Sequence, residues 1–179
     1  MDIFEEYMFI KKKSSKDYLI IACIMAAAAA VSCVLFMLPL IIARKTGMAF
    51  SFTIPIILAA LAWYGAYALI QRNYTEFEYT LVNSEMDIDK IIGKKSRKRL
   101  LSVDFKNAEI VAAVDDAEHK AELSKTGLTV YDAAGNYTDN VYFADFSTEK
   151  GEIRLLFRPT GAILENIRKF NPRNVFIKG

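Results

Sequence analysis

Two long stretches of the chain carry no charged side chain. They run from Tyr18 to Ala43 and from Thr46 to Gln71, and each contains 26 residues. A bilayer core about 30 Å thick needs roughly 20 helical residues at about 1.5 Å of rise each. Neither stretch has the polar stripe of a soluble amphipathic helix. The pattern therefore predicts two transmembrane helices, at about 18–43 and 51–71.

After residue 73 the chain changes to an alternation of apolar and polar residues. In EFEYTLV, residues 76–82, aromatic and aliphatic side chains alternate with acids and a threonine. A period of two is typical of a half-buried strand. Alternating carboxylates such as Glu76/Glu78 and Asp87/Asp89 are then expected on the wet face. The same pattern predicts further strands at 86–92, 101–103, 108–114, 128–131, 141–146 and 153–157.

The last element has a helical period instead. Thr160 is a candidate N-cap, and Ile163, Leu164, Ile167 and Phe170 lie on one face. The pair Asn171-Pro172 stops the helix. We therefore expect a C-terminal amphipathic helix at about 160–171.

Six or seven short antiparallel strands followed by one such helix resemble the bacterial pleckstrin-homology-like (PH-like) domains. Two spans followed by FEYTLVNSEMDIDKIIGKKSRKRLLSVDF and RLLFRPTGAILENIRKFNPRNV are similar to a bacterial two-span membrane family of unknown function. The resemblance implies an α+β membrane protein. A transmembrane helical hairpin would be followed at 73–179 by a small antiparallel β barrel or sandwich, closed by the C-terminal helix. The resemblance brings no catalytic residue with it.

The first 17 residues mix apolar residues with acids and lysines, which predicts an amphipathic cytoplasmic lead-in, either an interfacial segment or a short helix. The alternative is a signal peptide, because Lys11–Lys13 precede an apolar run and AVSC at 30–33 resembles a lipoprotein cleavage box. The run continues to Ile42, however, whereas the apolar core of a signal peptide spans about 7–15 residues. The only cysteines, Cys23 and Cys33, lie too far apart on one helix to form a disulfide.

Basic residues near the span ends predict the orientation. Four lysines (Lys11, Lys12, Lys13 and Lys16) precede the first span, whereas the connector carries only Arg44 and Lys45. The positive-inside rule then places both termini in the cytoplasm of a two-span cell-membrane protein. The short connector, with Gly47 as its turn residue, forces an antiparallel hairpin. Small residues in the second span, Ala62, Gly65 and Ala66, are candidates for close helix packing.

The formal net charge is only +2, but one segment is strongly basic. Six cations fall within ten residues: Lys90, Lys94, Lys95, Arg97, Lys98 and Arg99. The segment lies between two predicted strands, with Gly93 and Ser96 as turn residues, so we expect a hairpin tip. Three interpretations stay open: a solvated tip, a contact with the anionic leaflet worth about 1 kcal/mol per cation, and a contact with a protein. Residues 72–179 hold 17 basic and 17 acidic side chains, which argues against nucleic acid.

The sequence offers no catalytic motif. The single histidine, His119, lies in DDAEHK without the spacing of a zinc or EF-hand site and reads as part of a solvated acidic loop. No nucleophile elbow, Walker loop or dinucleotide fingerprint occurs. Both spans lack the acidic, basic and histidine side chains that mark ion and proton pathways in membrane proteins, so we expect no such pathway. We therefore expect no enzyme, cofactor, metal or small-molecule substrate.

The function that these patterns predict is a membrane-anchored, non-catalytic binding or scaffold module. Its cytoplasmic PH-like domain would face a protein partner or an anionic lipid surface. The alternative is a structural subunit that assembles through its transmembrane hairpin into a homo-oligomer or hetero-oligomer.

Overall fold

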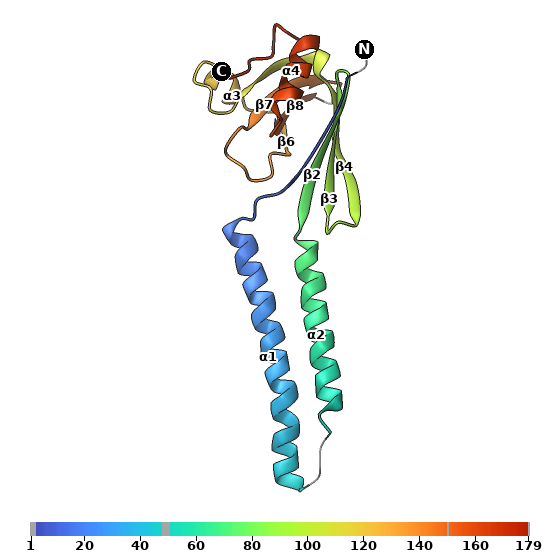
Figure 1. Ribbon diagram of the computed structural model, residues 1–179. Coiled ribbons are helices and arrows are strands. Elements are labelled where there is room, and N and C mark those ends of the chain that lie inside the picture. The colour runs from blue at the N-terminus through green and yellow to red at the C-terminus, as the bar shows by residue number, and fades with distance from the viewer. Residues whose placement is uncertain (1–2, 48–50, 150, 179) are drawn as a thin grey trace. The chain divides into compact units, whose positions relative to one another are not determined.

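The computed structural model describes residues 3–47, 51–149 and 151–178, which divide into two compact units (Figure 1). The first unit runs from Lys13 to Tyr74 and is helical. The second unit combines the residues up to Lys12 with those from Thr75 onward, and it contains every strand of the described residues. The helical unit is therefore inserted into the sequence of the β-rich unit.

The helical unit consists of α1 (Ser15–Thr46) and α2 (Thr53–Arg72). At the start of α1 the backbone N–H of Ser14 donates to the Asp17 carboxylate at 2.8 Å. The helix ends at Gly47, which adopts the left-handed conformation with φ of 69°. Both helices are long and apolar enough to cross a membrane. Residues 48–50 of the expected connector lie outside the described residues.

The two helices pack against each other through small side chains. The buried residues are Ala28 and Pro39 in α1 and Pro55, Ala59 and Ala66 in α2. In α2 these positions are four and seven residues apart, so they share one helix face. A hydrogen bond also crosses between the helices: Trp63 Nε1 donates to Ser32 Oγ at 3.1 Å. Ser32 Oγ in turn donates to the Ala28 carbonyl at 2.9 Å.

The β-rich unit contains two four-stranded sheets. The first sheet has the order β1 (Phe4–Ile10), β2 (Thr75–Val82), β3 (Glu85–Ile92) and β4 (Ser96–Asp104). The second has the order β5 (Ala108–Ala113), β7 (Tyr142–Thr148), β8 (Gly151–Phe157) and β6 (Thr129–Asp132). Three short helices complete the unit: η1 (Phe105–Asn107), α3 (Lys120–Leu123) and α4 (Gly161–Phe170).

The α+β class is as predicted, but the expected barrel is not closed. Within the described residues, no strand of the first sheet pairs with a strand of the second. Among the described residues, seven strands (β2–β8) follow residue 73, within the six or seven expected there, and β1 adds one from the N-terminal segment. The pairing was not expected to be mixed, but β6 runs parallel to β8. The chain leaves β4 through η1 and begins a new sheet at β5. Alternation reveals that a segment is a strand, but it does not reveal which neighbour the strand pairs with.

The N-terminal segment differs from the expected lead-in, because Phe4–Ile10 forms strand β1. It pairs antiparallel with β2, from Phe4 opposite Val82 to Ile10 opposite Glu76. Apolar residues occupy both faces of β1, so the period of two is hidden: Phe9 is buried while Phe4 and Met8 are exposed. The C-terminal domain predicted at 73–179 therefore includes residues from the start of the chain.

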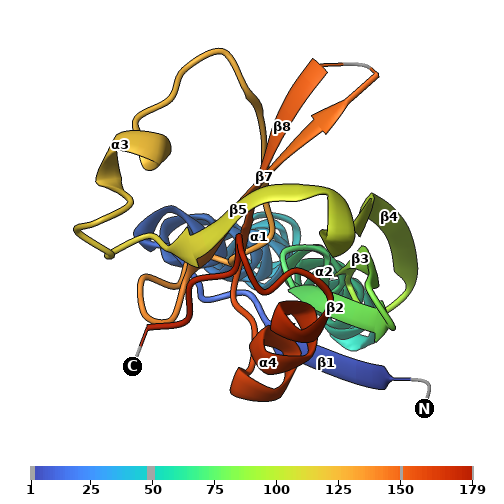
Figure 2. The same ribbon diagram turned by 90° about the horizontal axis from the view of Figure 1, so that it is seen from above.

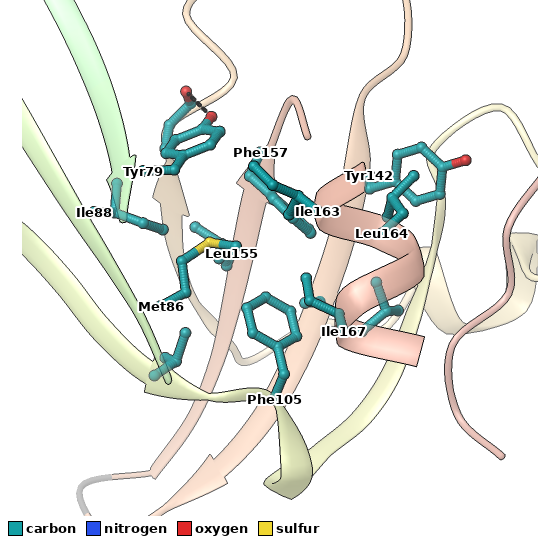
Figure 3. Close-up of a cluster of buried hydrophobic side chains, with 14 of the residues drawn as sticks. Tyr79, Met86, Ile88, Phe105, Tyr142, Leu155, Phe157, Ile163, Leu164 and Ile167 are labelled. Atoms are coloured by element: carbon teal, nitrogen blue, oxygen red, sulfur yellow. Dashed lines mark hydrogen bonds between the residues drawn. The ribbon is translucent and has the colours of Figure 1, made fainter. Parts of the chain in front are cut away.

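Helix α4 packs its apolar face onto the core of the β-rich unit. Figure 3 shows three side chains of α4 in this core, with Ile163 beside Phe157, Leu164 beside Tyr142 and Ile167 on the side of Phe105. The predicted N-cap is present, since Thr160 Oγ1 accepts from the Ile163 N–H at 3.3 Å. After the helix ends, the buried side chain of Asn171 donates to the carbonyls of Phe105 at 3.0 Å and Ala108 at 2.9 Å. These two bonds fix the corner at which the first sheet gives way to the second.

Candidate functional site

The basic segment forms the β3–β4 hairpin, as its position between two predicted strands indicated. Ile92 pairs with Ser96, so the turn itself is residues 93–95. Gly93 and Lys94 adopt left-handed conformations with φ of 61° and 59°. Glycine takes this conformation at no steric cost, whereas lysine rarely does. Ser96 is the first residue of β4 rather than a turn residue, so the three cations that follow it belong to the strand.

The two arginines of the segment bind carboxylates of neighbouring strands. Arg97 Nε lies 2.8 Å from Asp89 Oδ2, and its Nη2 contacts Glu78. Arg99 Nε lies 2.6 Å from Asp89 Oδ1, and its Nη1 lies 2.8 Å from Asp87 Oδ2. The hydrogen bond to Asp89 raises the pKa of both arginines. Five charged groups therefore form one ionic network across β2, β3 and β4.

This network corrects one of our expectations. Asp89 and Glu78 do not lie on a wet strand face, because they are only 5% and 8% exposed beneath the guanidinium groups. The six cations also do not form one uniform basic patch, because Arg97 and Arg99 lie against three acids. An ionised carboxylate can be buried only with such partners. These two arginines therefore act within the domain.

The four lysines of the segment are arranged differently, and we call Lys90, Lys94, Lys95 and Lys98 the lysine tip. Lys90 of β3 lies directly opposite Lys98 of β4. Since successive strand residues point to opposite faces, Lys98 lies on the other face of the sheet from Arg97 and Arg99. Among the residues that the structure describes, Lys90, Lys95 and Lys98 form no ion pair. Like charges placed opposite each other repel, so Lys90 and Lys98 give this end of the hairpin a positive charge that no ion pair among the described residues offsets at these two positions.

The lysine tip lies at the end of the first sheet that is joined to the two helices along the chain. Ile10, at the end of β1, pairs with Glu76, and the neighbouring Thr75 pairs with Ile92 just before the turn. Four residues separate Ile10 from the start of α1, and two separate the end of α2 from Thr75. At about 3.5 Å per residue these links are short. Both junctions with the helical unit therefore belong to the same end of the sheet as the lysine tip.

His119 lies in a loop in which Asp115 and Glu118 are exposed, as expected, but its own side chain is largely buried. Its side chain is 13% exposed, its Nδ1 lies 2.9 Å from Asp116 Oδ2, and its ring centroid is 4.1 Å from that of Phe176. The hydrogen bond to His119 lowers the pKa of Asp116. Across residues 3–47, 51–149 and 151–178, no three or more His, Cys, Asp or Glu side chains are grouped to hold a metal ion.

The sequence analysis missed a buried ion pair in the second sheet. Arg154 of β8 makes two hydrogen bonds to Asp145 of β7, at 2.7 and 2.6 Å, and both side chains are at most 6% exposed. Arg154 also donates to the carbonyls of Leu123 and Glu122, so the pair holds α3 against the sheet. The sequence contained one sign of it, because Asp145 interrupts an otherwise apolar strand.

The candidates for helix packing occupy different environments in α2. Ala66 is buried, whereas Ala62 and Gly65 are half-buried. Apart from neighbouring atoms of its own helix, a Cβ atom added at Gly65 would meet nothing within 4 Å, so the approach of the two helices does not depend on this glycine. Ala59, another small residue of the second span, is buried with Ala66 on the same helix face.

Comparison with known proteins identifies one family. The profile described as "Bacterial PH-like domain (DUF6106)" matches residues 1–177, and thus includes β1 and both helices as well as the C-terminal region. No curated protein matches the chain significantly, and no solved structure does.

Proposed function

We propose a function from one premise: the chain belongs to the bacterial PH-like domains (DUF6106), over residues 1–177. We infer that it is a membrane-anchored, non-catalytic binding module. In this proposal α1 and α2 cross the cell membrane, and both termini lie in the cytoplasm. The lysine tip then binds the anionic surface of the inner leaflet and holds the β-rich unit at the membrane.

Three properties of the helical unit support the anchor. A bilayer core needs a helix of roughly 20 residues. Helix α1 has 32 residues and α2 has 20, so both are long enough. Large apolar side chains such as Leu19, Leu61 and Tyr64 are at least 60% exposed, which is costly in water and favourable in lipid. The basic residues at the helix ends favour cytoplasmic termini by the positive-inside rule.

The observation that carries the proposal is the separation of the arginines from the lysines. Had Asp87 and Asp89 lain beside the lysines, they would have offset part of the attraction of the lysine tip for anionic lipid. They bind Arg97 and Arg99 instead, which leaves Lys90, Lys95 and Lys98 without an acidic partner among the described residues. Each such lysine near an anionic leaflet gains about 1 kcal/mol. The short links to the helices keep the tip at a high effective concentration near the bilayer.

The test uses the full chain in nanodiscs of either zwitterionic or 30% anionic lipid, with amide hydrogen exchange measured over residues 91–98. We expect about threefold slower exchange, or more, in the anionic discs. Sodium chloride at about 0.5 M should remove the difference, because it shortens the screening length to a few ångströms. The variant K90Q/K95E/K98E should show no difference between the two lipids. It leaves Arg97 and Arg99 in place, so that the ionic network is preserved.

The matched control is K106Q/K120E/K169E, which makes the same charge change at exposed lysines outside the hairpin. It should keep the difference between the two lipids. Equal exchange of the unaltered hairpin in both kinds of disc would refute the lipid contact. If the control variant also lost the slower exchange in anionic discs, the lipid dependence would be a nonspecific effect of net charge and not a contact of the lysine tip.

A further inference from the structure

The first and second sheets separate along the edges of β4 and β7. β4 is the last strand of the first sheet, so one of its edges has no partner strand within the described residues. The pairing of β5 with β7 ends where Ala108 meets Phe146. Ser147 and Thr148 continue β7 and pair only with β8. Figure 2 shows this extension of β7 and β8 running beyond β5.

A groove of about 500 Å³ lies between these two edges. Four consecutive residues of β4, 101–104, line it, together with the last three residues of β7, 146–148, and Glu149 of the turn that follows. Side chains of a strand alternate between its two faces, so consecutive residues can line one groove only where the strand turns its edge toward it. The groove is therefore bounded by two strand edges, whose backbone N–H and C=O groups are available for pairing.

The floor and the rim of this groove differ in chemistry. Leu101, Tyr131 and Ile153 are half-buried and pack against the core, so they form an apolar floor. Asp104 and Glu149 lie on the rim, and none of the described lining residues is basic. The Asp104 carboxylate accepts one hydrogen bond, from the Lys106 N–H at 3.0 Å, and forms no ion pair within the described residues. The rim thus carries net negative charge.

We propose that this groove, the β4–β7 slot, binds an extended peptide segment of a protein partner. The backbone of the peptide pairs with the edge of β4, one apolar side chain rests on the floor, and a neighbouring Lys or Arg faces Asp104 and Glu149. Four strand residues span about 13 Å, so the slot accepts a segment of about four residues. Pairing at an exposed edge supplies affinity through the main chain, and the floor and rim supply selectivity.

The charge of the rim decides between a peptide and a lipid. An anionic headgroup would be repelled by Asp104 and Glu149, whereas a basic peptide is attracted. The slot lies between β4 and β7 and shares no residue with the lysine tip. The proposal therefore goes beyond the membrane contact described above and does not rest on it.

The test uses the full chain in nanodiscs of zwitterionic lipid, which keeps lipid charge out of the measurement. The probes are fluorescent, acetylated heptapeptides in which Val, Ile, Leu or Phe alternates with Lys or Thr. Fluorescence anisotropy measures Kd. We expect that members of this library bind and that replacing Lys with Glu in the best binder weakens it at least tenfold. N-methylation of its alternate backbone amides should weaken it by a similar factor.

Ser147→Arg introduces bulk and positive charge at an exposed position in the slot and should weaken binding at least tenfold. Thr138→Arg is the matched control at an exposed site outside the slot and should bind as the unaltered chain does. Circular dichroism verifies that both variants are folded. Absence of binding throughout the library, equal affinity for Lys and Glu peptides, or full binding by Ser147→Arg would each overturn the proposal. Self-association that Ser147→Arg abolishes would assign the slot to a second copy of the chain and would also overturn it.

Discussion

At the scale of single residues, the β3–β4 hairpin shows that the charge of a segment does not fix its electrostatic field. Arg97 and Lys98 are neighbours in the sequence, yet the arginine binds two acids and the lysine binds none of the described ones. The cause is the pleat of the strand, which sends consecutive side chains to opposite faces. Acids on β2 and β3 lie on only one of these faces. Spacing in the sequence shows which side chains share a face, but only the register shows what lies opposite them.

Tyr79 provides a test at the same scale. Its ring is fully buried, its hydroxyl donates to the Ala133 carbonyl at 2.9 Å, and its oxygen accepts from the Arg158 N–H at 3.1 Å. Tyr79→Phe leaves both backbone groups without this partner, so we expect it to lower the free energy of unfolding by about 1–3 kcal/mol at pH 8. Urea titrations of the full chain in detergent, followed by the near-ultraviolet circular dichroism of the tyrosines, measure this difference.

The difference should depend on pH. Burial raises the pKa of Tyr79, so the folded state favours the neutral phenol. The stability that this phenol contributes is complete below the unfolded pKa of about 10 and is lost as pH rises toward the higher folded value. The difference in the free energy of unfolding between the unaltered chain and Tyr79→Phe should therefore become smaller as pH rises from 9 to 11. All other titrating groups are common to both proteins, and a gap that stayed constant over this range would contradict the argument.

At the scale of elements, the best predictions came from segments with one clean period. The alternation of 76–82 indicated β2, and the 3.6-residue spacing of Ile163, Leu164 and Ile167 indicated α4. Strand β1 was missed because Phe4 and Met8 on its outer face are as apolar as Tyr7 and Phe9 on its inner face. The open barrel and the β4–β7 slot could not be predicted, because both depend on which strand edges meet.

The burial of Phe9 makes β1 testable as a structural strand. Phe9 stacks on Phe77 at a centroid distance of 5.8 Å and meets the edge of Tyr79 at 5.4 Å, whereas its neighbour Met8 is 57% exposed. Phe9→Ala should lower the free energy of unfolding by about 3–5 kcal/mol. Met8→Ala should change it by no more than about 0.5 kcal/mol.

The same urea titrations measure both variants of β1. If residues 4–10 were not packed against the domain, neither side chain would be buried. The two substitutions would then have the same small effect on the free energy of unfolding. Equal and small changes in the free energy of unfolding would therefore contradict the structural role of β1 and favour the amphipathic lead-in that the sequence alone indicated.

At the scale of the whole molecule, the chain builds one domain from two separated segments. β1 precedes the helical unit and β2 follows it, yet the two strands are neighbours in one sheet. Lys12 extends this association, since its N–H donates to the Gly135 carbonyl at 2.8 Å and its carbonyl accepts from Asn136 Nδ2 at 3.0 Å. The helical unit thus occupies the place of a hairpin loop between β1 and β2. Both ends of that loop are held by hydrogen bonds within the β-rich unit.

This arrangement predicts how the β-rich unit can be separated from the membrane. Replacing residues 13–74 with a short glycine-rich linker turns β1 and β2 into an ordinary β-hairpin and removes both apolar helices. The resulting protein should be soluble without detergent and folded, with dispersed amide resonances in NMR spectra. A fragment of residues 75–179 lacks β1, so it exposes the edge of β2 and the aromatic rings that Phe9 covers. Because such an edge is a template for aggregation, the fragment should precipitate or remain poorly folded. If instead the fragment were as soluble and as stable as the linked protein, β1 would not be an integral strand of the domain.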